Sequence, residues 1–144
     1  MTQKVLDAWA VMAWLEGEVP ASTRVSALFA AASDQIIELL ISMINVGEIF
    51  YSIAKRRSTQ AAEEFLGDLA TFPVTIVIPG RRQILEAARL KSRFPISYAG
   101  AFATQAALEV EAALITGDHE IRNVSVRAGL RLDWIGATRK PAHR

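Results

Sequence analysis

The feature that most constrains the fold is an alternation along the chain of short apolar runs with longer amphipathic stretches. Short runs rich in Val, Ile and Leu are typical of buried strands, whereas apolar residues spaced three and four apart indicate helices. Strands that alternate with helices favour a mostly parallel sheet with helices on both faces. We therefore expect an α/β fold with strands at Lys4–Leu6, Ile36–Ile41, Val74–Ile78, Ala113–Thr116 and Leu130–Ile135.

Helices are expected between these strands, and three of them follow a serine. A serine just before a helix can accept a hydrogen bond from a free backbone N–H, so Ser42, Ser58 and Ser97 are predicted N-caps. Only a short turn is expected at His119–Asn123. The predicted helices are Ala8–Leu15, Ser22–Ala32, Met43–Lys55, Thr59–Thr71, Arg82–Arg93 and Tyr98–Val110.

The composition excludes several classes of protein. A chain with 51% hydrophobic and 22% charged residues is not intrinsically disordered. It has no cysteine, which excludes disulfides, thiolate catalysis and cysteine-bound zinc and fits a reducing cytoplasm. No uncharged apolar run reaches the ~20 residues of a membrane-spanning helix. We expect one cytoplasmic domain over residues 1–135, followed by a flexible basic tail at residues 136–144.

Three acidic residues stand where an α/β sheet usually carries its binding site, beyond the carboxyl ends of its strands. Asp7 follows the first predicted strand, Asp118 follows the fourth, and Glu48 lies in the helix after the second. Asp7 and Asp118 could equally be helix or turn caps. The neighbours of Glu48 are largely apolar, so its carboxylate is expected to be partly buried and to need either a metal ion or a distant arginine.

If the three carboxylates meet at one edge of the sheet, their mutual repulsion favours a shared cation. An all-oxygen site suits Mg²⁺ or Mn²⁺, with one or two carboxylates and water as ligands. Such an ion can stabilise charge on a phosphoryl oxygen and position an attacking water. The pattern is therefore compatible with phosphodiester hydrolysis. With 16 basic and 15 acidic residues, any contact with nucleic acid would have to come from local basic patches.

Four segments of the chain, in order, resemble the motifs of PIN domains, and specifically of VapC-type toxins from bacterial toxin–antitoxin pairs. They are Val5–Ala8, Ser42–Tyr51, Arg93–Ala103 and Ala113–Asp118, and the resemblance extends from about residue 4 to residue 135. It implies a five-stranded parallel sheet and a metal-dependent endoribonuclease that cuts RNA with Mg²⁺ or Mn²⁺. It also implies a homodimer and a VapB-type antitoxin as partner.

By matching position, the resemblance assigns the metal-site carboxylates to Asp7, Glu48 and Asp118. Thr116 and Asn45 resemble the residues that orient these carboxylates. Glu120, two residues after Asp118, is interpreted as a solvated charge rather than a further acid of the site.

One position departs from the family pattern, because Gly100 stands where the third motif carries an aspartate. Glycine offers no ligand and costs about 1 kcal/mol in a helix relative to alanine. The chain could be a natural weakened copy, a laboratory variant of a harmful toxin, or a protein in which a nearby acid such as Glu120 partly compensates. The alternative function is a catalytically inactive PIN-fold protein that still binds its antitoxin.

Other readings of the sequence are weaker. A phosphatase with Asp7 as nucleophile would normally carry a second aspartate two residues later, where this chain has Trp9. Trp9 itself is interpreted as a core or interface aromatic. The basic run Lys55-Arg56-Arg57 is interpreted as a solvated helix end, with phosphate contact as the alternative.

Overall fold

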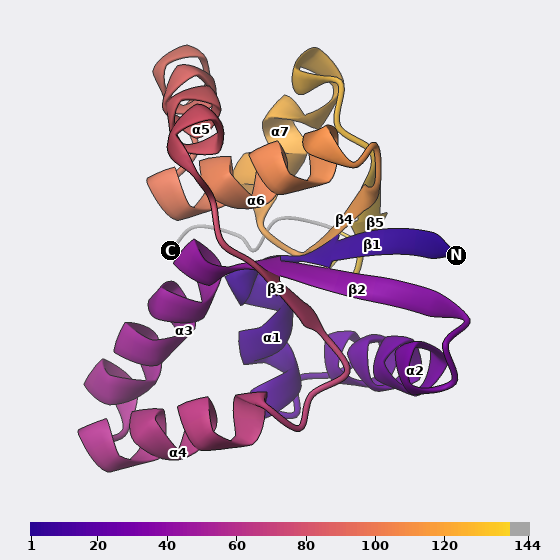
Figure 1. Ribbon diagram of the computed structural model, residues 1–144, viewed down its shortest axis with the longest axis vertical. Helices are drawn as coiled ribbons and strands as arrows, with labels where there is room; N and C mark the ends of the chain where they lie inside the picture. Colours follow the sequence, from indigo (N-terminus) through magenta and orange to yellow (C-terminus); the bar gives the residue numbers. More distant parts are fainter. Residues whose placement is uncertain (139–144) are drawn as a thin grey trace.

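Five parallel strands form the sheet at the centre of the computed structural model, which describes residues 1–138 (Figure 1). Their spatial order is β3-β2-β1-β4-β5, so the first strand lies in the middle and the chain builds outward on both sides. The predicted α/β fold is confirmed. The strands are β1 (Thr2–Leu6), β2 (Ile37–Ser42), β3 (Thr75–Val77), β4 (Ala113–Thr116) and β5 (Leu132–Trp134).

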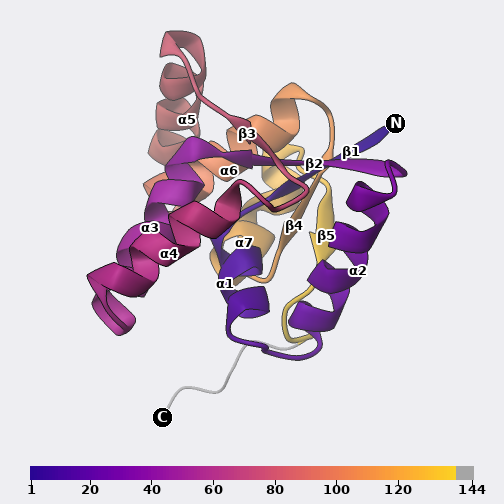
Figure 2. The same ribbon diagram turned by 60° about the horizontal axis from the view of Figure 1, so that its bottom comes forward.

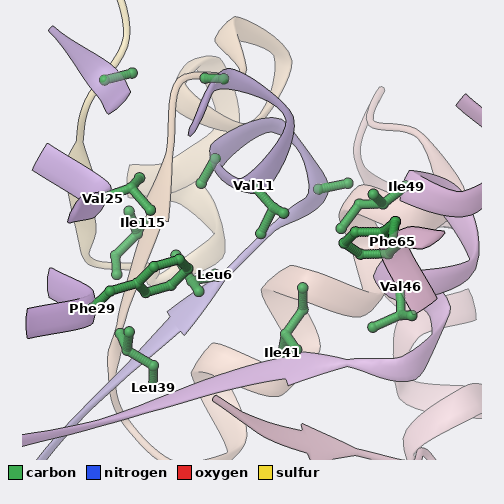
Figure 3. Close-up of a cluster of buried hydrophobic side chains, with 14 of the residues drawn as sticks. Leu6, Val11, Val25, Phe29, Leu39, Ile41, Val46, Ile49, Phe65 and Ile115 are labelled. Atoms are coloured by element: carbon green, nitrogen blue, oxygen red, sulfur yellow. The ribbon is translucent and has the colours of Figure 1, made fainter. Parts of the chain in front are cut away.

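The central strands are apolar at almost every position because both faces of the sheet are buried. Successive side chains of a strand point to opposite faces. Leu6, Ile41 and Ile115 therefore pack into one hydrophobic core, which Figure 3 shows, whereas Val5 and Leu114 pack into the second. All five are buried, and the register pairs Leu6 with both Ile41 and Ile115.

Two sets of helices cover the two faces (Figures 1 and 2). On one face lie α1 (Ala8–Leu15), α2 (Ala21–Ser33), α3 (Met43–Arg56) and α4 (Thr59–Leu69). On the other lie α5 (Arg81–Arg93), α6 (Tyr98–Glu109) and α7 (His119–Ala128). No helix within residues 1–138 is long and apolar enough to cross a membrane.

The predicted serine caps are present. The hydroxyl oxygens of Ser42, Ser58 and Ser97 accept hydrogen bonds from backbone N–H groups at the starts of α3, α4 and α6. Each cap satisfies one of the N–H groups that a helix leaves unpaired in its first turn. Local sequence therefore sets where these three helices begin.

The segment after Asp118 differs from the expectation. In place of a short turn at His119–Asn123, α7 continues to Ala128. It buries Ile121 and Val124, three residues apart on one face, and ends at Gly129, whose φ of +70° suits glycine. The Leu130 N–H bonds back to Ser125, so Leu130 belongs to the helix end and β5 starts later than predicted.

The other boundaries differ from the predicted ones by at most two residues, and those of α1 and β4 are as predicted. The edge strand β3 covers Thr75–Val77 within the predicted Val74–Ile78. The predicted domain boundary after residue 135 stays a prediction. Of the expected flexible tail at residues 136–144, residues 139–144 lie outside the described part of the chain.

Candidate active site

A cavity of about 320 Å³ opens at the carboxyl ends of β1 and β4, between α1, α3 and the start of α6. We call it the acidic pocket because five carboxylate side chains line it: Asp7, Glu16, Glu18, Glu48 and Asp118. The pocket brings together the three acids that the sequence singled out. Its other lining residues are Ala8, Trp9, Met12, Ala13, Asn45, Ser52, Arg56, Ser97, Gly100 and Ile121.

Asp7 is buried at the point where β1 passes into α1. One carboxylate oxygen accepts a hydrogen bond from the Ala10 backbone N–H at 2.9 Å, and the other accepts from the Thr116 hydroxyl. Burial raises the pKa of Asp7 from 3.8 to about 7, and the charges of Asp118 and Glu48 push it in the same direction. Asp7 is thus a helix cap, as one reading expected, and it also lines the pocket.

Thr116 connects two of the acidic positions. It is fully buried at the end of β4 and does not itself line the pocket. Its hydroxyl donates to Asp7 and accepts from the Asp118 backbone N–H at 3.0 Å. Because one hydroxyl carries a single donor and two acceptor sites, this geometry fixes the direction of both bonds. Asp118 in turn caps α7 through the Glu120 backbone N–H, at 2.9 Å.

Glu48 and Asn45 lie one turn apart on α3. The Asn45 side-chain N–H₂ group donates to the Ala99 carbonyl at 3.0 Å and to Glu48 at 3.4 Å. Its carbonyl oxygen Oδ1 is buried and has no hydrogen-bond partner within residues 1–138. Burial raises the pKa of Glu48, and the charge of Asp118 adds to this effect. No arginine or lysine within residues 1–138 forms an ion pair with Glu48.

Gly100 is the third residue of α6 and lines the same pocket. Its backbone N–H donates to Ser97 Oγ at 2.9 Å. A Cβ placed on Gly100 would lie 3.0 Å from Ser97 Oγ and 3.5 Å from Ile121 Cδ1. A side chain at this position is therefore possible if Ser97 moves by a few tenths of an ångström. Glu120 is exposed and is not among the lining residues, so the structure offers no support for compensation by that acid.

The sequence from residue 4 to residue 127 matches the PIN domain family. The chain belongs to this family. The match spans β1 to the last turn of α7, and so includes every element that contributes to the acidic pocket. No curated protein matches the chain in sequence.

Several solved structures with the same fold are toxins or toxin–antitoxin complexes. VapBC2 from Rickettsia felis, bound to a DNA fragment from its promoter, has a TM-score of 0.66 at 15% identity and covers 92% of this chain and 98% of its own. DNA-bound VapBC from Salmonella typhimurium has a TM-score of 0.67 at 12% identity, with the same coverages. Mycobacterium tuberculosis VapC20, a toxin that cleaves the sarcin–ricin loop, has a TM-score of 0.67 at 14% identity and covers 84% of this chain and 94% of its own. At such identities the likeness is one of fold.

The donors of this PIN domain fit a hard divalent cation. Carboxylate and amide carbonyl oxygens are the ligands that Mg²⁺ and Mn²⁺ prefer, and Asn45 Oδ1 is a buried oxygen without a partner. Within residues 1–138, no three Asp, Glu, His or Cys side chains are arranged to hold an ion together. The pocket therefore suits an ion with one or two carboxylate ligands and several waters.

Glu16, Glu18 and Trp9 also line the pocket, although the site expected from the sequence did not include them. Glu16 and Glu18 follow the end of α1, where the chain turns at Gly17 with φ +67°, and no residue spacing links them to Asp7. Trp9 packs against the core, as interpreted from the sequence, and also lines the pocket. Its ring lies so close to Gly117 that any Cβ there would collide with it. Gly117, between Thr116 and Asp118, was therefore the one feature of the sequence that could have indicated a close contact at this point.

Proposed function

We propose that this PIN-domain protein is the toxin of a type II, VapBC-like toxin–antitoxin system and that it is a metal-dependent endoribonuclease. The observation that carries the proposal is the acidic pocket, into which three separate elements bring Asp7, Glu48 and Asp118. The toxin–antitoxin complexes that share the fold support the biological role. The likeness in fold to VapC20, a toxin that cleaves the sarcin–ricin loop, supports RNA as the substrate.

PIN-domain nucleases generally use divalent metal ions. In this chain Asp7, Asp118 and Glu48 are the candidate ligands, of which one or two would bind the ion directly and the others through water. Bound there, Mg²⁺ or Mn²⁺ would stabilise charge on a phosphoryl oxygen and lower the pKa of an attacking water. Thr116 keeps the Asp7 carboxylate oriented through its hydrogen bond and ties it to the Asp118 backbone. The side-chain N–H₂ group of Asn45 donates to both Glu48 and the Ala99 carbonyl, and so links the carboxylate to the start of α6.

The partners expected from the sequence stay part of the proposal. They are an RNA substrate, a VapB-type antitoxin and a second copy of the chain in a homodimer, all in the cytoplasm. Met43, Ile44 and Tyr98 are large apolar side chains that are exposed at the starts of α3 and α6, as contact residues of a protein partner often are. Light scattering of the purified chain, alone and with its antitoxin, measures both assemblies.

A second candidate function rests on Gly100. A catalytically inactive PIN-fold protein would keep the fold and the antitoxin contact but lack one carboxylate of the pocket. The supporting observation is that Gly100 lines the pocket and contributes no side chain to it.

The test compares the native chain with Gly100→Asp on single-stranded RNA, with Mn²⁺, with Mg²⁺ and with EDTA. Restoring an acid should raise the cleavage rate roughly 10- to 100-fold, the usual scale for groups around a metal. Asp7→Asn in both backgrounds is the control and should abolish the gain. If Gly100→Asp cleaves no faster than the native chain, the site assignment is wrong. If the native chain is inactive but binds its antitoxin, the second function is favoured.

A further inference from the structure

The acidic pocket poses an electrostatic problem for the substrate proposed above. RNA carries one negative charge per nucleotide, and five carboxylates line the pocket. A metal ion can offset only part of that charge. Among the lining residues within the described chain, Arg56 is the sole Lys or Arg. Arg56 is therefore the one positively charged side chain among the described lining residues that can attract a phosphate.

Arg56 is the last residue of α3, two turns beyond Glu48. Its Nη1 atom lies 2.8 Å from Oε1 of Glu16, at the end of α1, so the ion pair joins two helices that contact each other. Both side chains are accessible, with 64% of Arg56 and 38% of Glu16 exposed. An exposed pair of this kind adds little to stability and is easily exchanged.

A guanidinium group binds phosphate through two parallel hydrogen bonds, and this geometry makes arginine suited to phosphate recognition. We propose that Arg56 is a substrate-positioning residue that binds an RNA phosphate next to the one being cleaved. In the free protein the Arg56 guanidinium forms its ion pair with the Glu16 carboxylate. On binding, the phosphate takes the place of the Glu16 carboxylate. This inference rests on the proposed ribonuclease function and adds the phosphate contact and its competitor.

The exchange predicts opposite effects for the two members of one ion pair. Arg56→Ala removes the phosphate contact and should weaken RNA binding about 5- to 10-fold. Glu16→Gln frees the guanidinium and removes a repelling charge, so it should tighten binding about 2- to 5-fold. In the Arg56→Ala background, Glu16→Gln should tighten RNA binding much less, because the guanidinium that it would free is absent. A purely structural ion pair would make both single variants change binding in the same direction.

The matched control is a second exposed pair away from the pocket. Arg82 Nη1 lies 2.9 Å from Glu86 Oε1 on α5, and the two side chains are 61% and 41% exposed. Arg82 also pairs with Glu109 at the end of α6. Arg82→Ala and Glu86→Gln change the same charges as the test variants. They should leave RNA binding within about twofold of the native value. Thermal unfolding of all the variants checks that each is folded.

Binding is measured by fluorescence anisotropy of a labelled single-stranded RNA, with Ca²⁺ as the probe metal, over a range of KCl concentrations. Arg56→Ala should also flatten the dependence of log Kd on log salt by about 0.7, the value for one phosphate contact on a single strand. In the cleavage assay it should raise KM with little change in kcat.

Each outcome bears on one proposal or on both. If the native chain binds RNA and Arg56→Ala binds equally well, the Arg56 inference is overturned and the ribonuclease proposal stands. The same holds if Glu16→Gln weakens binding. If neither the native chain nor any variant binds or cleaves RNA, the proposed function fails and this inference fails with it.

Discussion

Replacing Asp7 by asparagine should change how the stability of the metal-free protein depends on pH. The pKa of Asp7 is about 7 in the folded chain and 3.8 when the carboxyl is unperturbed. Because the folded state favours the protonated carboxyl, the stability that this residue contributes is complete below about pH 3.8 and is lost as pH rises through 7. At 1.36 kcal/mol per pKa unit, the full loss is about 4 kcal/mol.

The substitution isolates this effect from the other titrating groups. Asparagine is as good an N-cap as aspartate, so it can still accept the hydrogen bond from the Ala10 N–H, but it binds no proton in this range. Between pH 5 and pH 8, the unfolding free energy of the native chain should fall by about 3 kcal/mol more than that of Asp7→Asn. Guanidinium denaturation in EDTA at the two pH values measures the difference.

Two further measurements decide whether the reasoning holds. Asp34→Asn removes an exposed carboxyl far from the pocket and should show the same pH dependence as the native chain. Adding Mn²⁺ at pH 8 should stabilise the native chain but not Asp7→Asn, because the ion binds the carboxylate. Identical pH dependence for the native chain and Asp7→Asn would refute the argument, since it would mean that the Asp7 carboxyl is not desolvated.

Two other substitutions test contacts around the pocket. Thr116→Val removes the hydroxyl that orients Asp7 and should lower the cleavage rate about 10- to 100-fold, and unchanged kinetics would show that the hydrogen bond has no role. Gly117→Ala places a Cβ against the Trp9 ring and should lower the free energy of unfolding by about 1–3 kcal/mol, measured by denaturant titration. In a Trp9→Ala background the same substitution should cost much less, and an equal cost would place the strain elsewhere.

The sequence allowed most of the fold to be predicted, because each central strand is buried on both faces. Leu39–Ile41 and Leu114–Ile115 have no polar position that could face solvent, and such runs are distinctive. The helix α7 was missed for the opposite reason. It buries Ile121 and Val124 between charged and polar neighbours, and this narrow apolar stripe is hard to distinguish from a turn.

The site was predictable only where chain order determines position. Asp7 directly follows β1 and Asp118 lies two residues after the neighbouring parallel strand β4, so the topology alone brings them to the same edge of the sheet. Glu16 and Arg56 reach the pocket from the far ends of α1 and α3, and their meeting depends on how those helices pack. No local pattern contains that packing, so Arg56 was interpreted from the sequence as part of a solvated helix end, with phosphate contact as the alternative.

Gly100 affects the stability of the protein as well as the number of carboxylates in the pocket. Burial raises the pKa of Asp7 and of Glu48, and repulsion between the acids of the pocket adds to this effect. An aspartate at position 100 would add another negative charge to this cavity, and it would also displace Ser97. In EDTA at pH 8, Gly100→Asp should therefore be less stable than the native chain, even though glycine is the poorer helix former.

Divalent metal should make Gly100→Asp the more stable of the two proteins. The added carboxylate would then bind the cation, whose charge offsets the repulsion from the other acids. Thermal unfolding of both proteins over a range of Mn²⁺ concentrations tests the argument. The Tm of Gly100→Asp should start to rise at a lower Mn²⁺ concentration than the Tm of the native chain. If the two proteins respond to metal identically, the side chain at position 100 does not reach the ion. In that case any ribonuclease activity of this chain has to be explained by Asp7, Glu48 and Asp118 without a contribution from position 100.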